Sequence, residues 1–336
     1  MALNGADRDL LDRCLELAER GRRTVAPNPV VGAVVVRDGD VAGEAWHVRP
    51  GSAHAEVRAL EAAGDASGAT VYCNLEPCSH HGRTPPCADA LIAAGVRRVV
   101  VSMIDPTDKV NGEGAARLRA AGVEVDVAGG ELERLARRAN AEWLTLALAG
   151  RPHVTYKAAV SADGRTAAVS GGPGWISSAA SRALVHEMRA WMGAVAVGSG
   201  TVLADDPLLT ARDCDPPAER QPLRLVFDRR GRVPADARLL RTATDEAPVE
   251  VTPGAPSEVL AALGRRRISS VLLEGGATLA TAFLDAGLID RVVLFTAPVE
   301  LGPGPGLFLR DVPLPDPVET RRVGPDILTV HEMREP

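Results

Sequence analysis

The 336-residue chain has no long basic run, few aromatic residues and no long apolar run. Its formal net charge is −6 and its aromatic content is 3%. A protein that binds nucleic acid needs positive charge for the phosphates and aromatic side chains for unpaired bases, so we expect no nucleic-acid partner. A single phosphorylated small molecule is compatible with this charge. No apolar stretch reaches the ~20 residues that span a bilayer, so we expect no membrane partner.

Cysteine is scarce as well, and its number is odd. Of the five cysteines, two lie in a metal-binding pattern described below, which leaves Cys14, Cys73 and Cys214. These three are interpreted as buried or free thiols of a reducing compartment. Residues 1–8 lack the basic and apolar segments of a secretory signal. We therefore expect a cytoplasmic protein.

The remaining composition is that of an ordinary globular protein, with 46% apolar and 24% charged residues. The chain is too long for one ordinary core, so two domains are expected. The helix-breaking sequence Gly150-Arg151-Pro152 marks the boundary, which gives domains 1–150 and 151–336. In both halves strand-like runs alternate with helical patterns, and this alternation predicts α/β domains.

Periodicity and turn residues give the expected elements. In the first half, the expected strands are 30–36, 40–43, 69–75, 98–103 and 123–127, and the expected helices are 7–20, 54–63, 87–94, 113–121 and 132–148. In the second half, the expected strands are 153–160, 194–197, 223–227, 270–273 and 291–295, and the expected helices are 178–191 and 278–286. Cys73 alternates within a strand and is expected in the core.

Four residues of the first half form the pattern of a catalytic zinc site: His54, Glu56, Cys78 and Cys87. One imidazole and two thiolates are good zinc ligands, and three protein ligands leave the fourth position open for water. Zinc lowers the pKa of that water, and a carboxylate at the start of the same helix can carry a proton to a leaving amine. Glu56 is therefore the candidate catalytic residue, and the other three are the candidate ligands.

This pattern resembles that of the zinc-dependent nucleoside and nucleobase deaminases, H-x-E followed by P-C-x-x-C. Here eight residues rather than two separate Cys78 from Cys87. Two alternatives stay open. A nucleic-acid base deaminase is disfavoured by the charge, the aromatic content and the long loop between the cysteines. A non-catalytic, zinc-stabilised binding or regulatory protein is disfavoured by the presence of Glu56.

The loop over residues 77–87 resembles that of the RibD family, the bifunctional deaminase–reductases of riboflavin biosynthesis. Residues 26–32, 157–165 and 201–207 are similar to that family too. The resemblance implies a cytidine-deaminase-like three-layer α/β/α domain followed by a dihydrofolate-reductase-like α/β domain, with Zn²⁺ and NADPH as cofactors. It implies a phosphoribosyl pyrimidine substrate that is deaminated and then reduced in its ribosyl unit. We also expect a homo-oligomer.

The resemblance assigns four residues to the deaminase substrate: Asn28, His47, His80 and Arg83. A histidine and an arginine on a loop tied at both ends by metal ligands suit a phosphate. Taken alone, Asn28 is typical of a turn between two prolines, and Arg83 of a solvated loop. The chain departs from the family at two places, Thr107-Asp108 and Val299-Glu300, where the family has Asn-Pro and a lysine-containing sequence.

In the second half a buried strand ends in Glu274-Gly275-Gly276 and a helix follows at once. Backbone N–H groups at such a helix start suit the phosphates of a dinucleotide, although a Gly-Gly turn alone is more often a matter of geometry. The resemblance places the cofactor at Ala159, Trp175, Thr201, Asp205, Gly276, Ala277 and Thr278. It places the reductase substrate at Lys157, Arg189, Leu209, Arg212 and Glu274.

Physical reasoning adds roles for some of these residues. Arg189 and Arg212 suit a phosphate, and Glu274 suits a hydrogen bond to ribose or pyrimidine, although Arg189 alone would fit a cap of its own helix end. Because the nicotinamide carries the hydride, no side chain need do covalent chemistry. Ser161 and Asp163 share the motif of Lys157. Three arginines follow a strand end where a 2′-phosphate would fit: Arg229, Arg230 and Arg232.

Overall fold

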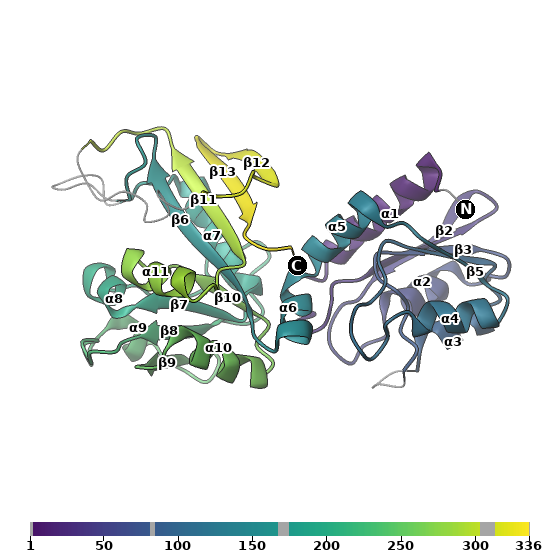
Figure 1. Cartoon of the computed structure of the whole chain (residues 1–336), viewed down its shortest axis with the longest axis horizontal. Coiled ribbons are helices and arrows are strands. Elements are labelled where there is room, and N and C mark those ends of the chain that lie inside the picture. Colours follow the sequence, from purple (N-terminus) through teal and green to yellow (C-terminus); the bar gives the residue numbers. More distant parts are fainter. Residues whose placement is uncertain (1–2, 81–84, 167–174, 303–312, 336) are drawn as a thin grey trace. The chain divides into compact units, whose positions relative to one another are not determined.

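The computed structural model of the chain describes residues 3–80, 85–166, 175–302 and 313–335 (Figure 1). They form two compact units, one ending at Leu148 and the other running from Ala149 to Glu335. Each unit has its own sheet and its own hydrophobic core, so the expected pair of α/β folds is confirmed. Within the described part of the chain, no helix is both long and apolar enough to cross a membrane.

The first unit is built around a five-stranded sheet in the order β2-β1-β3-β4-β5. Strand β1 pairs antiparallel with β2 and β3, whereas β3, β4 and β5 are parallel. The strands are β1 (Gly32–Arg37), β2 (Asp40–Trp46), β3 (Thr70–Cys73), β4 (Arg98–Val101) and β5 (Glu124–Val127). The helices are α1 (Gly5–Glu19), α2 (Ala55–Ala63), α3 (Cys87–Ala93), α4 (Glu113–Ala120), α5 (Gly130–Ala139) and α6 (Ala141–Ala149).

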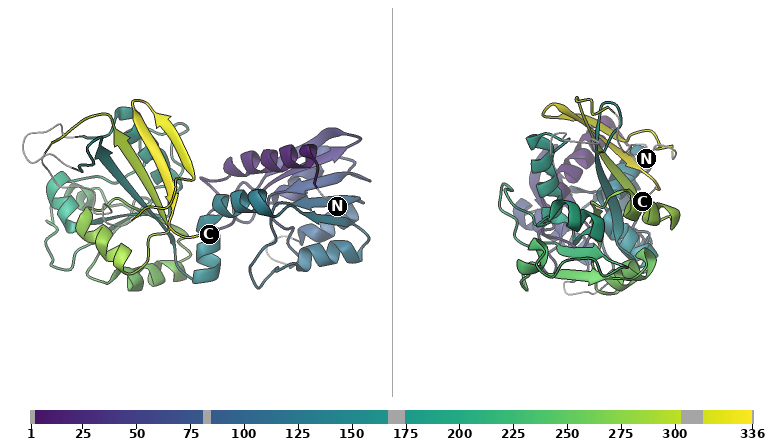
Figure 2. Two further views of the ribbon diagram at one scale, coloured as in Figure 1. Left: turned by 45° about the horizontal axis from the view of Figure 1, so that its top comes forward. Right: turned by 90° about the vertical axis from the view of Figure 1, so that its left-hand side faces the viewer.

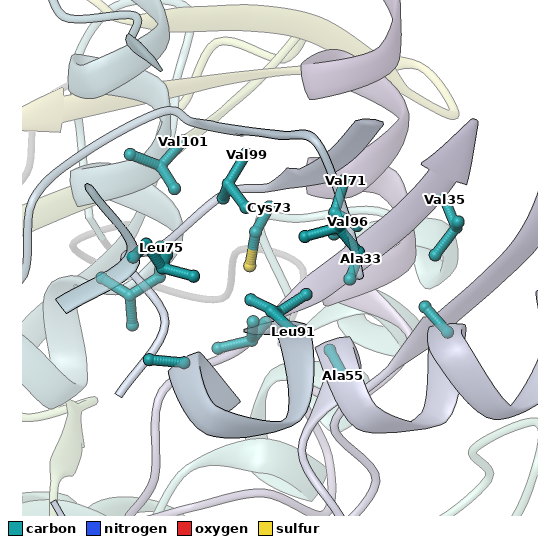
Figure 3. Packing of buried hydrophobic residues seen from close by; sticks show 14 of the residues in the cluster. Ala33, Val35, Ala55, Val71, Cys73, Leu75, Leu91, Val96, Val99 and Val101 are labelled. Atoms are coloured by element: carbon teal, nitrogen blue, oxygen red, sulfur yellow. The ribbon is translucent and has the colours of Figure 1, made fainter. Parts of the chain in front are cut away.

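Helices cover both faces of this sheet. Because neighbouring strand residues point to opposite faces, Val71 and Cys73 pack toward α2 and α3, whereas Tyr72 packs toward α1. Figure 1 shows α1 and α5 on one face and α2, α3 and α4 on the other. Cys73 is fully buried near Leu91 of α3 (Figure 3), as the sequence predicted. The first unit is therefore a three-layer α/β/α fold.

One expected element is wrong. The sequence pattern predicted a single helix over residues 132–148, but α5 ends before Asn140 and α6 begins after it. The Asn140 side chain is buried and binds the backbone of Val30 through both its oxygen and its nitrogen. The same side-chain nitrogen also donates to the Ala136 carbonyl oxygen, and asparagine side chains that bond the local backbone in this way disfavour the interior of a helix.

The second unit contains an eight-stranded sheet in the order β12-β13-β11-β6-β10-β7-β8-β9. The strands from β11 to β9 are parallel, and the hairpin of β12 and β13 joins antiparallel at one edge, in yellow in Figure 2. The strands are β6 (His153–Ser161), β7 (Ala194–Gly198), β8 (Leu223–Phe227), β9 (Val249–Thr252), β10 (Ser270–Leu273), β11 (Arg291–Ala297), β12 (Glu319–Val323) and β13 (Asp326–Glu332).

Helices cover both faces of the second sheet as well. They are α7 (Ala179–Trp191), α8 (Ser199–Asp205), α9 (Arg238–Arg241), α10 (Pro256–Arg265) and α11 (Ala277–Asp285). Helices α10 and α11 pack on one face and α7, α8 and α9 on the other. Because β6, β7 and β10 are parallel neighbours, the residues after their carboxyl ends gather at one edge of the sheet, where ligands of such sheets usually bind.

Candidate active sites

The three predicted zinc ligands meet where α2 and α3 begin. His54 is the N-cap residue of α2, Cys87 is the first residue of α3, and Cys78 lies in the loop after β3. The Nδ1 atom of His54 is 3.2 Å from Sγ of Cys87 and 3.6 Å from Sγ of Cys78. Within the described residues, these three form the group whose ligand atoms, all within 4.8 Å of one another, can share one metal ion.

Contacts within this cluster favour the thiolate form of Cys78. Hydrogen bonding to Cys87 and to His54 lowers the pKa of the Cys78 thiol to about 4, although burial opposes the change. The backbone N–H of Cys87 also donates to Sγ of Cys78 over 3.3 Å. In turn, the hydrogen bond to Cys78 raises the pKa of His54. The cluster thus favours the thiolate form at Cys78, whereas the hydrogen bond between the two cysteines and burial raise the pKa of Cys87.

Glu56 lies in the first turn of α2 and is only 4% exposed. Burial raises the pKa of its carboxyl group, while the charge of His54 and a hydrogen bond with Cys87 act in the opposite direction. The Oε2 atom is buried and has no hydrogen-bond partner among the described residues. A buried carboxylate oxygen left free beside three metal ligands is placed to handle a proton rather than to stabilise the fold.

Asn28 and His47 form a pair beside the zinc ligands. The Asn28 Nδ2 and His47 Nε2 atoms are 3.2 Å apart, and His47 Nδ1 lies 3.4 Å from the Ala53 carbonyl oxygen. Since that oxygen can only accept, Nδ1 carries the proton and Nε2 accepts from the Asn28 amide. Burial and the neighbouring His54 lower the pKa of His47 to about 4, so the ring is neutral. Its ring stands edge-on to that of His54, with centroids 5.2 Å apart.

Two buried asparagines hold the segment that follows Asn28. Asn74 Oδ1 accepts from the Gly32 N–H over 2.8 Å, and Asn140 Oδ1 accepts from the Val30 N–H over 2.8 Å. The side-chain nitrogens of both asparagines donate to the Val30 carbonyl oxygen. The two side chains thus bind the backbone of this segment as a neighbouring strand would, and they fix the position of the turn. Sequence reasoning missed both residues, and the only available signal was a polar residue in an apolar pattern.

Of the other two candidate residues of this site, His80 lies within the described residues and Arg83 does not. His80 is exposed in the loop after Cys78, and Asp105 lies near enough to interact with it electrostatically. Asp105 begins the stretch where the chain departs from the RibD family pattern, and the Thr107 N–H donates to its carboxylate. Arg83 lies outside the described residues, so its expected contact with a phosphate stays a prediction.

In the second unit, Glu274 forms ion pairs with two candidate substrate residues. Its oxygens accept from Nε and Nη2 of Arg189 over 2.7 and 2.9 Å, and Nζ of Lys157 lies 3.4 Å away. Burial alone would raise the pKa of Glu274, but Lys157 and Arg189 outweigh it and hold the pKa at about 2. Because Arg189 donates to Glu274 and not to the end of its own helix, the alternative capping role is wrong.

Arg189 also fixes the backbone that carries Leu209 and Arg212. Its Nη1 donates to the Thr210 carbonyl oxygen over 3.2 Å. Leu209 is buried and has a left-handed backbone, with φ of 57°, which is costly for a leucine and marks sites held by their surroundings. Arg212 extends from the same segment, and burial together with Arg189 lowers its pKa. The structure thus brings these substrate candidates together.

Six of the seven cofactor candidates lie at or after the carboxyl ends of β6, β7 and β10, and Trp175 is the exception. Gly276 is the N-cap residue of α11, and no side chain caps the N–H groups of the exposed Ala277 and Thr278. Thr201 and Asp205 lie on α8 directly after β7, and Ala159 lies on β6. Trp175 is 69% exposed, with the Arg182 guanidinium 5.3 Å from its ring centroid.

Ser161 and Asp163 have a structural role in the second unit. The Asp163 carboxylate accepts from the Ser161 hydroxyl and from the backbone N–H groups of Leu301 and Gly302. Asp163 therefore ties the end of β6 to the segment that contains the Val299-Glu300 departure. Of the three arginines proposed for a 2′-phosphate, Arg232 donates to the Ser199 hydroxyl over 3.0 Å at the start of α8.

Comparison with known proteins identifies the family. A model of the cytidine and deoxycytidylate deaminase zinc-binding region matches residues 5–103, and a model of the RibD C-terminal domain matches residues 152–329. The riboflavin biosynthesis protein RibD of Escherichia coli is 43% identical, with 96% of this chain and 98% of that protein covered. The chain belongs to the RibD family. A RibD protein of Mycobacterium tuberculosis is 45% identical, with 94% of each chain covered.

Solved RibD structures show the same fold over nearly the whole chain. RibD of Acinetobacter baumannii has a TM-score of 0.84 and 38% identity, and covers 97% of this chain and 98% of its own. The deaminase/reductase of Thermotoga maritima has a TM-score of 0.85 and 35% identity over the same shares. The predicted fold class, the bifunctional deaminase and reductase activity and the cofactors Zn²⁺ and NADPH are thereby confirmed, and the two alternative functions are set aside.

The residues present fit both cofactors of a RibD enzyme. Zinc prefers one imidazole and two thiolates with an open fourth position, and His54, Cys78 and Cys87 supply that set beside the unpartnered oxygen of Glu56. For NADPH, a Cβ built on Gly276 would meet nothing within 4 Å. The start of α11 is therefore open to phosphate groups, which such helix starts bind through their N–H groups.

Proposed function

We propose that the chain performs two consecutive steps on one phosphoribosyl pyrimidine, with the deaminase domain in residues 1–150 and the reductase domain in residues 151–336. The first step hydrolyses the 2-amino group of 2,5-diamino-6-ribosylamino-4(3H)-pyrimidinone 5′-phosphate and releases ammonia. The second reduces the ribosyl unit of 5-amino-6-(5-phosphoribosylamino)uracil with NADPH. The Thermotoga maritima relative, described as a deaminase and reductase of these pyrimidines, supports this substrate pair.

In the deaminase domain, His54, Cys78 and Cys87 hold the metal and Glu56 moves the proton. Zinc bound by three protein ligands lowers the pKa of a bound water and so supplies a nucleophile near neutral pH. Glu56 accepts a proton at Oε2 and donates it to the amine that leaves as ammonia. Its raised pKa suits this exchange, because a group that both accepts and donates works best near the operating pH.

Four further residues bind the deaminase substrate in this proposal. Asn28 is held against neutral His47, which leaves its side-chain oxygen free to accept a hydrogen bond from a pyrimidine. His80 and Arg83 follow Cys78 in the chain and bind the 5′-phosphate through charge-assisted hydrogen bonds. The partly buried pairing of Asn28 and His47 supports their role, because a side chain fixed before binding loses little entropy on contact with its ligand.

In the reductase domain, the chain positions two molecules against each other. Ala159, Trp175, Thr201, Asp205, Gly276, Ala277 and Thr278 bind NADPH, which supplies the hydride. The ion-paired cluster of Lys157, Arg189 and Glu274, with Leu209 and Arg212 on the neighbouring segment, binds the phosphoribosyl substrate. The pairing of β6 with β10 supports this arrangement, since Tyr156 lies opposite Leu273 and the next residues are Lys157 and Glu274.

The observation that supports the first step most directly is the buried, unpartnered Oε2 of Glu56 beside the three ligands. The variant Glu56→Gln tests the role proposed for this residue. We expect ammonia release to fall by about 10²–10⁴-fold, because the variant cannot carry a proton. Zinc content should stay near that of the unchanged protein, and NADPH oxidation with supplied deaminated intermediate should continue. Mass spectrometry of products with and without NADPH separates the two steps. Unchanged ammonia release would remove Glu56 from the mechanism.

We further infer a cytoplasmic homo-oligomer. None of the five cysteines forms a disulfide in the described structure, which suits a reducing compartment. Sedimentation analysis of the zinc-loaded protein measures the oligomeric state, and a monomer at all concentrations would contradict this inference.

A further inference from the structure

Helix α4 lies directly against the loop that carries Cys78. A Cβ built on Gly114, in the first turn of α4, would lie 1.9 Å from the carbonyl oxygen of Pro77 and 3.2 Å from Oε1 of Glu76. Real atoms do not approach so closely, so the backbone of α4 touches the peptide immediately before Cys78. Any side chain at position 114 must displace either the helix or this peptide.

Glu76 joins the same loop to the start of α4 through its carboxylate. The side chain is 3% exposed. Its Oε1 accepts from the Ala115 N–H over 2.9 Å, and its Oε2 accepts from the N–H groups of Gly112 and Asp105, each over 3.1 Å. The N-cap residue, Gly112, has no side chain to cap the helix. Glu76 takes over that function from outside the helix, two residues before Cys78.

Arg117, on the next turn of α4, contacts the flanks of both cysteine ligands. Its Nη1 donates to the carbonyl oxygen of Ser79 over 3.3 Å, beside Cys78. Its Nε lies 2.6 Å from Oδ1 of Asp89, which lies on α3, the helix that begins at Cys87. One guanidinium thus spans the two chain segments that present sulfur to the metal.

We propose that α4 is a brace for the zinc site, in which Glu76, Gly114 and Arg117 act as positioning residues that set the relative placement of Cys78 and Cys87. The three contacts fall on residues 76, 77 and 79 around one ligand, and on the helix that starts at the other. The brace slows loss of the metal, because a rigid pair of thiolates must be distorted before either can dissociate.

Gly114→Ala tests this proposal with a readout other than turnover. Alanine is a better helix former than glycine, so an adverse effect of this change must come from the contact with the Pro77 peptide and not from helix propensity. We expect that zinc transfer to a chromogenic chelator becomes about tenfold faster, because overpacking moves the peptide before Cys78. The Co²⁺-substituted variant should also show shifted thiolate-to-cobalt absorption. The matched control is Ala116→Gly, an exposed change in the same helix, which lowers helix propensity without touching the loop.

Arg117→Met keeps the proposal testable if Gly114→Ala does not fold. Arg117 is about half exposed, so its loss should leave folding intact while zinc release becomes about two- to fivefold faster, in line with the strength of exposed ion pairs. The control is Arg119→Met, since Arg119 donates to Val125 and not to the metal loop. NADPH-dependent reduction should be unchanged in all four variants. Zinc release and cobalt spectra like those of the controls would overturn the proposal.

Discussion

Arg189 and Glu274 share two parallel hydrogen bonds, 2.7 Å from Nε to Oε1 and 2.9 Å from Nη2 to Oε2, although 85 residues separate them. The pair joins the last turn of α7 to the end of β10. A third bond from Arg189 reaches the Thr210 carbonyl oxygen. The guanidinium of Arg189 therefore connects three elements of the proposed reductase site.

The first prediction concerns Arg189→Lys, which keeps the charge but removes the planar fork. Lysine cannot donate to both Glu274 oxygens and to Thr210 at once. We expect kcat/KM for NADPH-dependent reduction to fall by about 10- to 100-fold, the range of a lost hydrogen bond between charged groups. Absorbance at the NADPH band measures this, and ammonia release by the same sample is the control. Equal loss of both activities would indicate misfolding rather than a local effect.

The second prediction concerns Asn140, which binds Val30 across 110 residues. Asn140→Ala leaves the buried N–H of Val30 without its acceptor, and such a loss costs about 1–3 kcal/mol. The unfolding midpoint of the first unit in urea should fall accordingly. Because Val30 follows the Asn28 turn, KM for deamination should rise more than kcat falls. A stability loss with unchanged KM would show that Asn140 supports the core but not the turn.

A buried network at Asp7 gives a pH-dependent prediction. Its carboxylate accepts from Tyr72 and Arg98, and Arg98 also pairs with Asp126. Burial alone would raise the pKa of Asp7, but Arg98, the Asn4 N–H and Tyr72 together lower it from 3.8 to about 2. A shift of this size corresponds to about 2 kcal/mol of stability.

Because the pKa of Asp7 is lower in the folded state, its stabilising effect is full above pH 3.8 and disappears as the pH falls toward 2. Asp7→Asn should therefore lower the free energy of unfolding by about 2 kcal/mol at pH 7 and by progressively less below pH 4. Urea unfolding of metal-free protein in chelator measures the difference without competing zinc loss. A difference that stays constant down to pH 3 would contradict the assigned pKa.

The metal ligands could be predicted because they are recognised from their residue type and from the residues next to them in the sequence. Only certain residue types bind zinc, and the flanking Pro77 and Pro86 and the helix start at His54 identify the elements that present them. Cys73 was separated from the ligands by strand alternation alone, and its burial confirms that step. The ends of strands were less certain: β1 starts at Gly32 rather than residue 30, and β2 continues to Trp46.

Contacts between distant segments could not be predicted in the same way. The buried side chain at the break, Asn140, binds Val30, and the N-terminus of α4 is capped by Glu76, which lies 36 residues before Gly112. Neither partner is visible in a local pattern. In the second unit, no expectation covered α8, α10 or the β12–β13 hairpin. The ion pair of Arg189 with Glu274 likewise required the pairing of strands to bring the two together.

The division of the chain at Leu148 has a consequence for how such a gene can change. In the described residues, every strand pairing joins segments on the same side of that point. A gene divided at that point would separate no paired strands, and each product would keep the residues proposed for its own reaction. Separate genes for the two halves, fusion to other partners, or loss of one half are therefore open evolutionary routes.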